Sequence, residues 1–174
     1  MGNNIEEHFF GAKDKKVNSY RKGANNERSL SYALGRWTGK EFTRVPRSGG
    51  LRWLSTQNVC GDLICTDAKF NFPFNIETKH YKAFSFDLST GKNKDVYKAW
   101  EQTKSDSERS GKDPIMFLRQ NKMPANTWYV FLDAERFNFS EFLYPPIHNV
   151  NGLLMYRSED IFTIKYKKFL KFVL

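Results

Sequence analysis

Apolar residues recur at helical spacing in several parts of the chain and predict four helices. The clearest pattern covers residues 22–37, where one stripe of the helix is apolar. That stripe consists of Leu30, Ala33, Leu34 and Trp37. A second amphipathic helix is predicted over residues 95–109, a short one over residues 135–143, and a closing one over residues 160–172.

Shorter apolar runs between these helices are typical of strands. They cover residues 41–45, 61–66, 74–80, 114–118 and 127–132, and residues 153–156 are expected to form an edge strand. The order of the elements predicts an α/β fold in which helices pack against a mixed sheet. Because 174 residues suit one domain, we expect residues 1–20 to form a flexible basic arm and residues 21–174 to form a single domain.

Alternation within residues 74–80 gives the chain its first candidate chemistry. Asn75, Glu77 and Lys79 project to one face of the expected strand, because successive side chains point to opposite sides. Asp62 begins a neighbouring apolar run. Two carboxylates can hold a hard cation such as Mg²⁺, and a lysine beside them can orient water, which suits hydrolysis of a phosphodiester. The structural alternative is a solvated ion pair between Glu77 and Lys79, with Asp62 as a turn residue.

Glu27 is a third carboxylate in an unexpected place. It falls on or beside the apolar stripe of the first predicted helix, where a charged side chain needs a partner. One interpretation is an ion pair with Arg28, Arg21 or Lys22 near the start of the helix. The other is that Glu27 faces the two carboxylates described above, and the pattern alone leaves both open.

Composition changes this picture mainly through charge. The chain has 28 Lys and Arg residues against 19 Asp and Glu residues, and its net charge of +9 suits a polyanionic partner such as nucleic acid. No apolar run is long enough to span a membrane, and residues 1–16 lack the apolar core of a secretion signal. Cys60 and Cys65 are expected to be reduced and partly buried, which is consistent with a cytoplasmic setting.

A series of motifs in a fixed order points to a known family. They are Arg21-Lys22-Gly23, Glu27-Arg28, Arg44, Ser48-Gly49, Asp62 and Glu77-Thr78-Lys79. In this order they resemble the archaeal-type Holliday junction resolvases of the PD-(D/E)xK nuclease superfamily. The resemblance covers residues 20–132 in layout, and residues 133–174 have no counterpart in it.

The resemblance implies a restriction-endonuclease-like mixed central sheet flanked by helices, with residues 21–174 as one nuclease domain. It implies a metal-dependent endodeoxyribonuclease that hydrolyses phosphodiesters in branched DNA, with Mg²⁺ or Mn²⁺ as the metal. The implied metal ligands are Asp62, Glu77 and Glu27, with the Ile76 carbonyl as an additional ligand, and the implied catalytic residues also include Lys79 and Ser48. The implied DNA contacts are Arg21, Lys22, Arg28, Arg44, Arg47 and Gln102. The family acts on four-way junctions as homodimers.

Two other functions stay open at this point. A restriction, nicking or repair nuclease would keep the chemistry and act on duplex or flap DNA. Trp53 and the aromatic run at residues 70–74 favour it, because aromatic rings stack on unpaired bases. A catalytically inert DNA-binding module would keep only the fold, but such a module gains nothing from carboxylates that repel a polyanion. The Lys-, Asn- and Phe-rich composition suits a phage or another mobile element.

Overall fold

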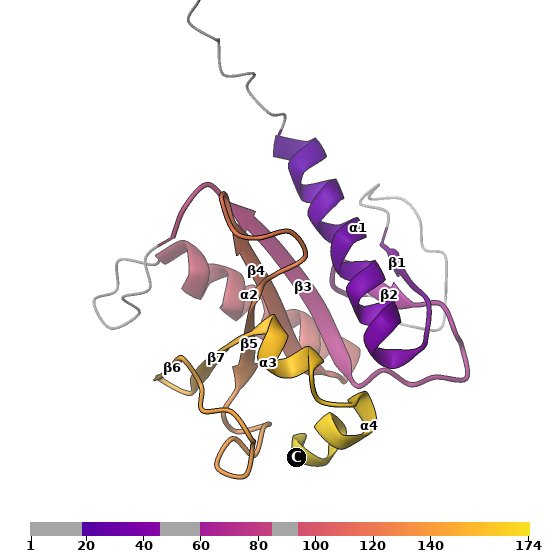
Figure 1. The fold of residues 1–174 in the computed structure, drawn as a ribbon, viewed down its shortest axis with the longest axis vertical. Coiled ribbons are helices and arrows are strands. Elements are labelled where there is room, and N and C mark those ends of the chain that lie inside the picture. The colour runs from indigo at the N-terminus through magenta and orange to yellow at the C-terminus, as the bar shows by residue number, and fades with distance from the viewer. Residues whose placement is uncertain (1–18, 46–59, 85–93) are drawn as a thin grey trace, which may run out of the picture.

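A seven-stranded sheet forms the centre of the molecule (Figure 1). The structure is a computed structural model and describes residues 19–45, 60–84 and 94–174. The strands are β1 (Phe42–Arg44), β2 (Leu63–Cys65), β3 (Phe74–Tyr81), β4 (Asp113–Gln120), β5 (Tyr129–Asp133), β6 (His148–Val150) and β7 (Leu153–Arg157). Their spatial order is β1-β2-β3-β4-β5-β7-β6. The pair β3–β4 is parallel and the other described pairs are antiparallel, so the predicted mixed sheet is confirmed.

The helices α1 (Ser19–Thr38) and α2 (Lys94–Ser110) cover opposite faces of this sheet. Leu30 of α1 packs in one apolar cluster with Ile76 and Ile115, whereas α2 packs in a second cluster that contains Met116. Ile115 and Met116 are neighbours in β4 and point to opposite faces, which separates the two layers. None of the described helices is long and apolar enough to cross a membrane.

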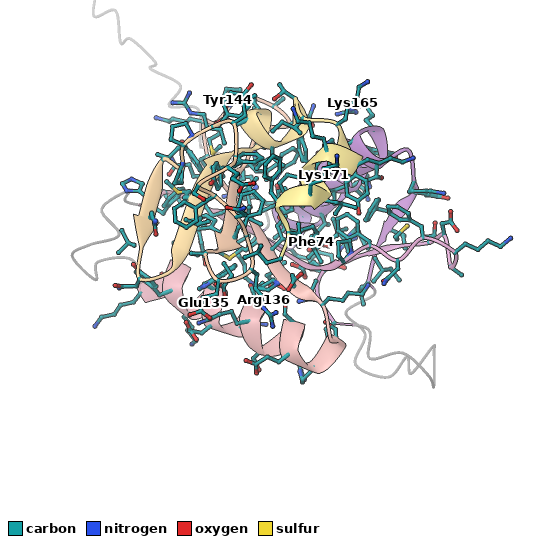
Figure 2. The ribbon with its side chains drawn as sticks, turned by 90° about the horizontal axis from the view of Figure 1, so that it is seen from below. Phe74, Glu135, Arg136, Tyr144, Lys165 and Lys171 are labelled. Carbon is teal, nitrogen blue, oxygen red and sulfur yellow. The ribbon has the colours of Figure 1, made fainter. Side chains whose placement is uncertain are left out.

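The C-terminal segment forms short turns where one helix over residues 160–172 was predicted, so that prediction is wrong. These turns are α3 (Ser158–Phe162), α4 (Tyr166–Phe169) and the 3-10 helix η1 (Leu170–Phe172). The Ile164 carbonyl accepts a hydrogen bond from Trp37 Nε1 at 2.8 Å. Aromatic rings of α3 and α4 surround Trp37, and this tertiary packing interrupts the regular helix. Lys165 and Lys171 mark this segment in Figure 2.

The helix predicted over residues 135–143 is also wrong, because the backbone there forms turns. Asn138 N donates to Phe172 O at 2.7 Å, and Leu174 N donates to Arg136 O at 3.0 Å. These hydrogen bonds join the segment to the C-terminal residues instead of closing helical turns. The expected edge strand, β7, lies inside the sheet, because the unpredicted β6 pairs with its outer side.

The aromatic run at residues 70–74 belongs largely to the core. Phe72 and Phe74 are 2% and 4% exposed. The Phe72 ring lies edge-on to Phe42 with centroids 5.0 Å apart and stacks on Tyr166 at 5.9 Å. These two buried rings are therefore not available to stack on bases, which removes part of the reason for the duplex or flap alternative. Trp53, the other aromatic residue invoked for it, lies outside the described residues.

Candidate active site

Strand β3 places Glu77 and Lys79 on the sheet face that α2 covers. Glu77 is in register with Met116, whose side chain packs in the α2 cluster, and Lys79 is two residues further along the same face. Lys79 Nζ donates to Glu77 Oε1. The Glu77 side chain is 4% exposed and the Lys79 side chain is 23% exposed. The two residues therefore form a largely buried pair and not the solvated ion pair of the structural alternative.

Asp62 is fixed against the same strand by two hydrogen bonds. Its backbone N donates to Ile76 O at 2.7 Å, and its Oδ2 accepts from the backbone N of Thr78 at 2.9 Å. Asp62 is 8% exposed, so its carboxylate lies buried beside the segment that carries Glu77. Gly61, immediately before it, has φ +86° and lies so close to Ile76 O that a Cβ would be 2.6 Å away. The close approach of this glycine to β3 therefore fixes the position of Asp62.

Burial and the neighbouring carboxylate dominate the electrostatics of Glu77. Burial raises the pKa of Glu77, the Asp62 carboxylate raises it further, and Asp106 of α2 adds to this effect. The Lys79 ammonium opposes these effects, and the resulting pKa is about 7. The buried Asp62 carboxylate thus disfavours a second negative charge on Glu77. A cation bound by the two carboxylates would offset this repulsion.

The Asp62–Glu77 pair fits a hard divalent cation. Mg²⁺ in proteins is commonly held by one or two carboxylates together with water and substrate phosphates, so two carboxylates suffice. Among residues 19–45, 60–84 and 94–174, no three His, Cys, Asp or Glu side chains gather closely enough to hold a metal together. The Ile76 carbonyl accepts the Asp62 N–H, and its additional role as a metal ligand stays a prediction.

Glu27 is buried as an ionic partner of Arg44. It is 4% exposed on the inner face of α1, and its Oε2 accepts a hydrogen bond from Arg44 Nε on β1. Neither interpretation from the sequence named this partner, because the contact joins a helix to a strand 17 residues away. Arg44 is in register with Leu63, the residue that follows Asp62 in the chain. The role of Glu27 as a metal ligand stays a prediction.

Three of the basic residues expected to contact DNA lie on the first half of α1. Arg21 and Arg28 are exposed, and Arg28 donates to Asn25 Oδ1 at 3.2 Å. Lys22 is half-buried and donates to the Tyr81 carbonyl at 3.2 Å, and burial lowers the pKa of its ammonium group. Arg21 and Arg28 are therefore directed to solvent, whereas Lys22 is held against the end of β3.

Three other residues expected at the site lie elsewhere or outside the described chain. Gln102 is exposed on α2, whereas the neighbouring Thr103 faces the sheet. Ser48 and Arg47 fall in residues 46–59, which the structure does not describe. The roles proposed for these three residues stay predictions.

Asp106 is a site neighbour that the sequence pattern missed. The end of α2 reads as solvated, yet Asp106 and Ser107 are buried, and the Asp106 carboxylate contributes to the raised pKa of Glu77. Arg109 donates to Asp106 Oδ1 from one turn further along α2. Asp106 lies three residues after Thr103 and so continues the buried stripe of the helix. This spacing is the signal by which the sequence could have identified it.

Comparisons with known proteins identify the family to which the chain is similar. The sequence pattern of the family described as "Phage putative PDDEXK endonuclease" matches residues 18–170. No curated protein matches the chain. Among solved structures, Hjc, a Holliday junction resolvase from the archaeal hyperthermophile Archaeoglobus fulgidus, is 18% identical to it. That match covers 79% of this chain and 90% of the resolvase, with a TM-score of 0.39.

Proposed function

The chain belongs to the phage PDDEXK endonuclease family, and from that membership we propose that it is a Mg²⁺-dependent endodeoxyribonuclease that cuts branched DNA. The observation that carries the proposal is the buried group of Asp62, Glu77 and Lys79. Burying two carboxylates beside one another is costly unless the site takes up a cation, so a site of this kind is more than a structural contact. An inert DNA-binding module would gain nothing from these two carboxylates.

Each residue of the group has a defined task in this proposal. Asp62 and Glu77 hold the cation through their carboxylate oxygens, with the Ile76 carbonyl as a further ligand, and Mn²⁺ suits the same oxygen ligands. When bound, the metal activates water and neutralises charge on the phosphoryl oxygens. Lys79 orients the attacking water through its ammonium group. Glu27 adjusts the site from α1, where it also holds Arg44.

Charge on α1 supports DNA as the substrate. Glu27 is the acidic residue of this helix and is buried, so the solvent-facing charges of α1 are all positive. We assign Arg21, Lys22, Arg28 and Arg44 to phosphate contacts near the cut, together with Arg47, Ser48 and Gln102. A net charge of +9 favours association with a polyanion along a broad surface.

The preferred substrate in this proposal is a four-way junction. This part of the proposal depends on the order of the motifs from Arg21 to Lys79, which resembles that of the junction resolvases. A homodimer would place two identical sites across the two-fold axis of such a junction, so that both strands of equal polarity are cut. The family description also supports a phage-encoded protein.

A cleavage assay separates these possibilities. End-labelled four-way junction, flap and linear duplex of matched sequence are incubated with Mg²⁺ and either wild-type protein or Asp62→Asn. We expect paired symmetric cuts in the junction, and loss of cutting in the variant. Equal cutting of all three substrates would indicate a nuclease of broader specificity and would contradict a preference for junctions. Tight binding of all substrates without any cutting would overturn the nuclease proposal.

A further inference from the structure

A line of buried hydrogen bonds connects Asp62 with the C-terminal part of the chain. Asp62 Oδ2 accepts from the backbone N of Thr78, and Thr78 Oγ1 accepts from Asn26 Nδ2 at 2.7 Å. Asn26 Oδ1 in turn accepts from Trp128 Nε1 at 2.9 Å. The line therefore runs from the candidate site through β3 and α1 to the residue that precedes β5.

The line continues from Trp128 to the start of α3. Trp128 N donates to Ser158 Oγ at 2.9 Å, and Ser158 N donates to Trp128 O at 2.8 Å. Ser158 Oγ donates to Glu159 Oε2 at 3.0 Å. This double contact holds Trp128 to the segment after β7, which belongs to the part of the chain without a counterpart in the sequence resemblance.

The central residues of this line are all excluded from water. Asn26 is 5%, Thr78 4%, Trp128 1% and Ser158 1% exposed. A buried amide that loses a partner cannot recover the hydrogen bond from solvent, so the satisfied arrangement is strongly preferred over displaced ones. Asn26 thereby fixes α1 on β3 at one register.

The position of Asn26 makes this register important for the site. It directly precedes Glu27 on α1, and its partner Thr78 lies between Glu77 and Lys79 on β3. A shift of α1 along β3 would move these side chains relative to one another. Small displacements of catalytic groups reduce rates strongly, even when binding of the substrate is unchanged.

We propose that Asn26 and Trp128 are positioning residues that hold Thr78, and through it Asp62, in the arrangement needed for cleavage. The C-terminal part of the chain is then a part of the catalytic scaffold, because Ser158 anchors Trp128. This inference rests on the proposed nuclease function.

The test compares two tryptophans that make the same kind of hydrogen bond. Trp128→Phe removes the indole N–H that Asn26 accepts and keeps an aromatic ring in the core. Trp37→Phe is the matched control, because Trp37 Nε1 also links α1 to the C-terminal segment, at the Ile164 carbonyl, but does not contact β3 or Asn26 through it. Both variants lose one indole hydrogen bond, so both are expected to lower the melting temperature.

The expected difference is in catalysis. Single-turnover cleavage of the DNA substrate at saturating Mg²⁺, measured at a temperature where each variant is fully folded, should be slowed at least about 10-fold by Trp128→Phe. Trp37→Phe should cleave at the wild-type rate, and the Kd for DNA measured in EDTA should stay the same for both. Equal rates in the two variants would overturn the inference.

A second pair of variants keeps the test decisive if Trp128→Phe does not fold. Thr78→Val removes the hydroxyl that accepts from Asn26 and preserves shape, whereas Thr78→Ser preserves the hydroxyl. Slow cleavage by the valine variant and near wild-type cleavage by the serine variant support the inference, and equal rates contradict it. If Asp62→Asn cleaves DNA as fast as the wild-type protein, that result contradicts the proposed function instead. The two failures are therefore distinguishable.

Discussion

Replacing Gly61 by alanine tests how the fold positions the candidate active site. Gly61 has φ +86°, and a Cβ built on it would lie 2.6 Å from Ile76 O and 2.7 Å from Asn75 Oδ1. Both atoms belong to β3, which also carries Glu77. The variant Gly61→Ala must therefore move the backbone that leads into Asp62 away from this strand.

The size of this movement follows from the contact distances. Ordinary contact of a Cβ begins at 3.4 Å, so the backbone must retreat by about 0.8 Å. The hydrogen bonds from Asp62 N to Ile76 O and from Thr78 N to Asp62 Oδ2 are 2.7 and 2.9 Å long. The same retreat would lengthen them to about 3.5 Å or more, beyond a normal hydrogen bond.

We expect two measurable consequences. The left-handed φ costs alanine about 1–2 kcal/mol, and loss of the buried hydrogen bonds adds about 1–3 kcal/mol. The free energy of unfolding should therefore fall by about 2–5 kcal/mol in urea titrations. A displacement of nearly 1 Å at a metal-binding carboxylate should slow cleavage by about 100-fold, even at temperatures where the variant is folded.

Gly111→Ala is the matched control for this prediction. Gly111 has φ +68°, but nothing lies within 4 Å of its Cβ position. The free energy of unfolding of Gly111→Ala should fall only by the conformational cost of the left-handed φ, about 1–2 kcal/mol. Its rate of cleavage should equal that of the wild-type protein. If Gly61→Ala cleaves as fast as Gly111→Ala, the close approach of Gly61 to β3 does not position Asp62.

Two further predictions concern charge. Because the folded-state pKa of Glu77 is about 7, above its usual value of 4.5, the stability it contributes is fully present below pH 4.5 and is lost as pH rises through 7. In EDTA, urea unfolding should therefore show a decrease of at most about 3 kcal/mol between pH 4.5 and 7.5. Glu77→Gln should reduce this decrease, and an unchanged pH profile would contradict the raised pKa. For DNA binding, the logarithm of the association constant should fall linearly with the logarithm of salt concentration, and Arg21→Ala or Arg28→Ala should each reduce the slope by about 1. A salt-independent Kd measured by fluorescence anisotropy would refute phosphate binding by α1.

The parts of the site that follow from local periodicity could be predicted from the sequence. The period of two in β3 places Glu77 and Lys79 on one face, and the apolar stripe of α1 identifies its buried side. Both patterns depend on residues only a few positions apart. The structure brings Asp62 to them through the pairing of β2 with β3 and the close approach of Gly61 to Ile76.

The features that could not be predicted depend on long-range contacts. Asp106 lies in a polar helix end and is buried only because α2 packs on the sheet. The closing helix is interrupted because Trp37, more than 100 positions earlier, takes the Ile164 carbonyl as its hydrogen-bond acceptor. The partner of Glu27 is Arg44, on a different element. No periodic pattern contains these pairings.

One comparison decides whether Asp62 forms part of a metal-dependent nuclease site. Single-turnover strand cleavage of a labelled four-way junction is measured across a Mg²⁺ titration for wild-type protein, Asp62→Asn and Asp67→Asn. Asp67 is a suitable control because it is a nearby carboxylate paired with Lys40 at the surface. We expect Mg²⁺-dependent cleavage by wild-type protein and Asp67→Asn, and none above background by Asp62→Asn. Undiminished cleavage by Asp62→Asn, or cleavage by wild-type protein in EDTA, would contradict a metal-dependent role for Asp62.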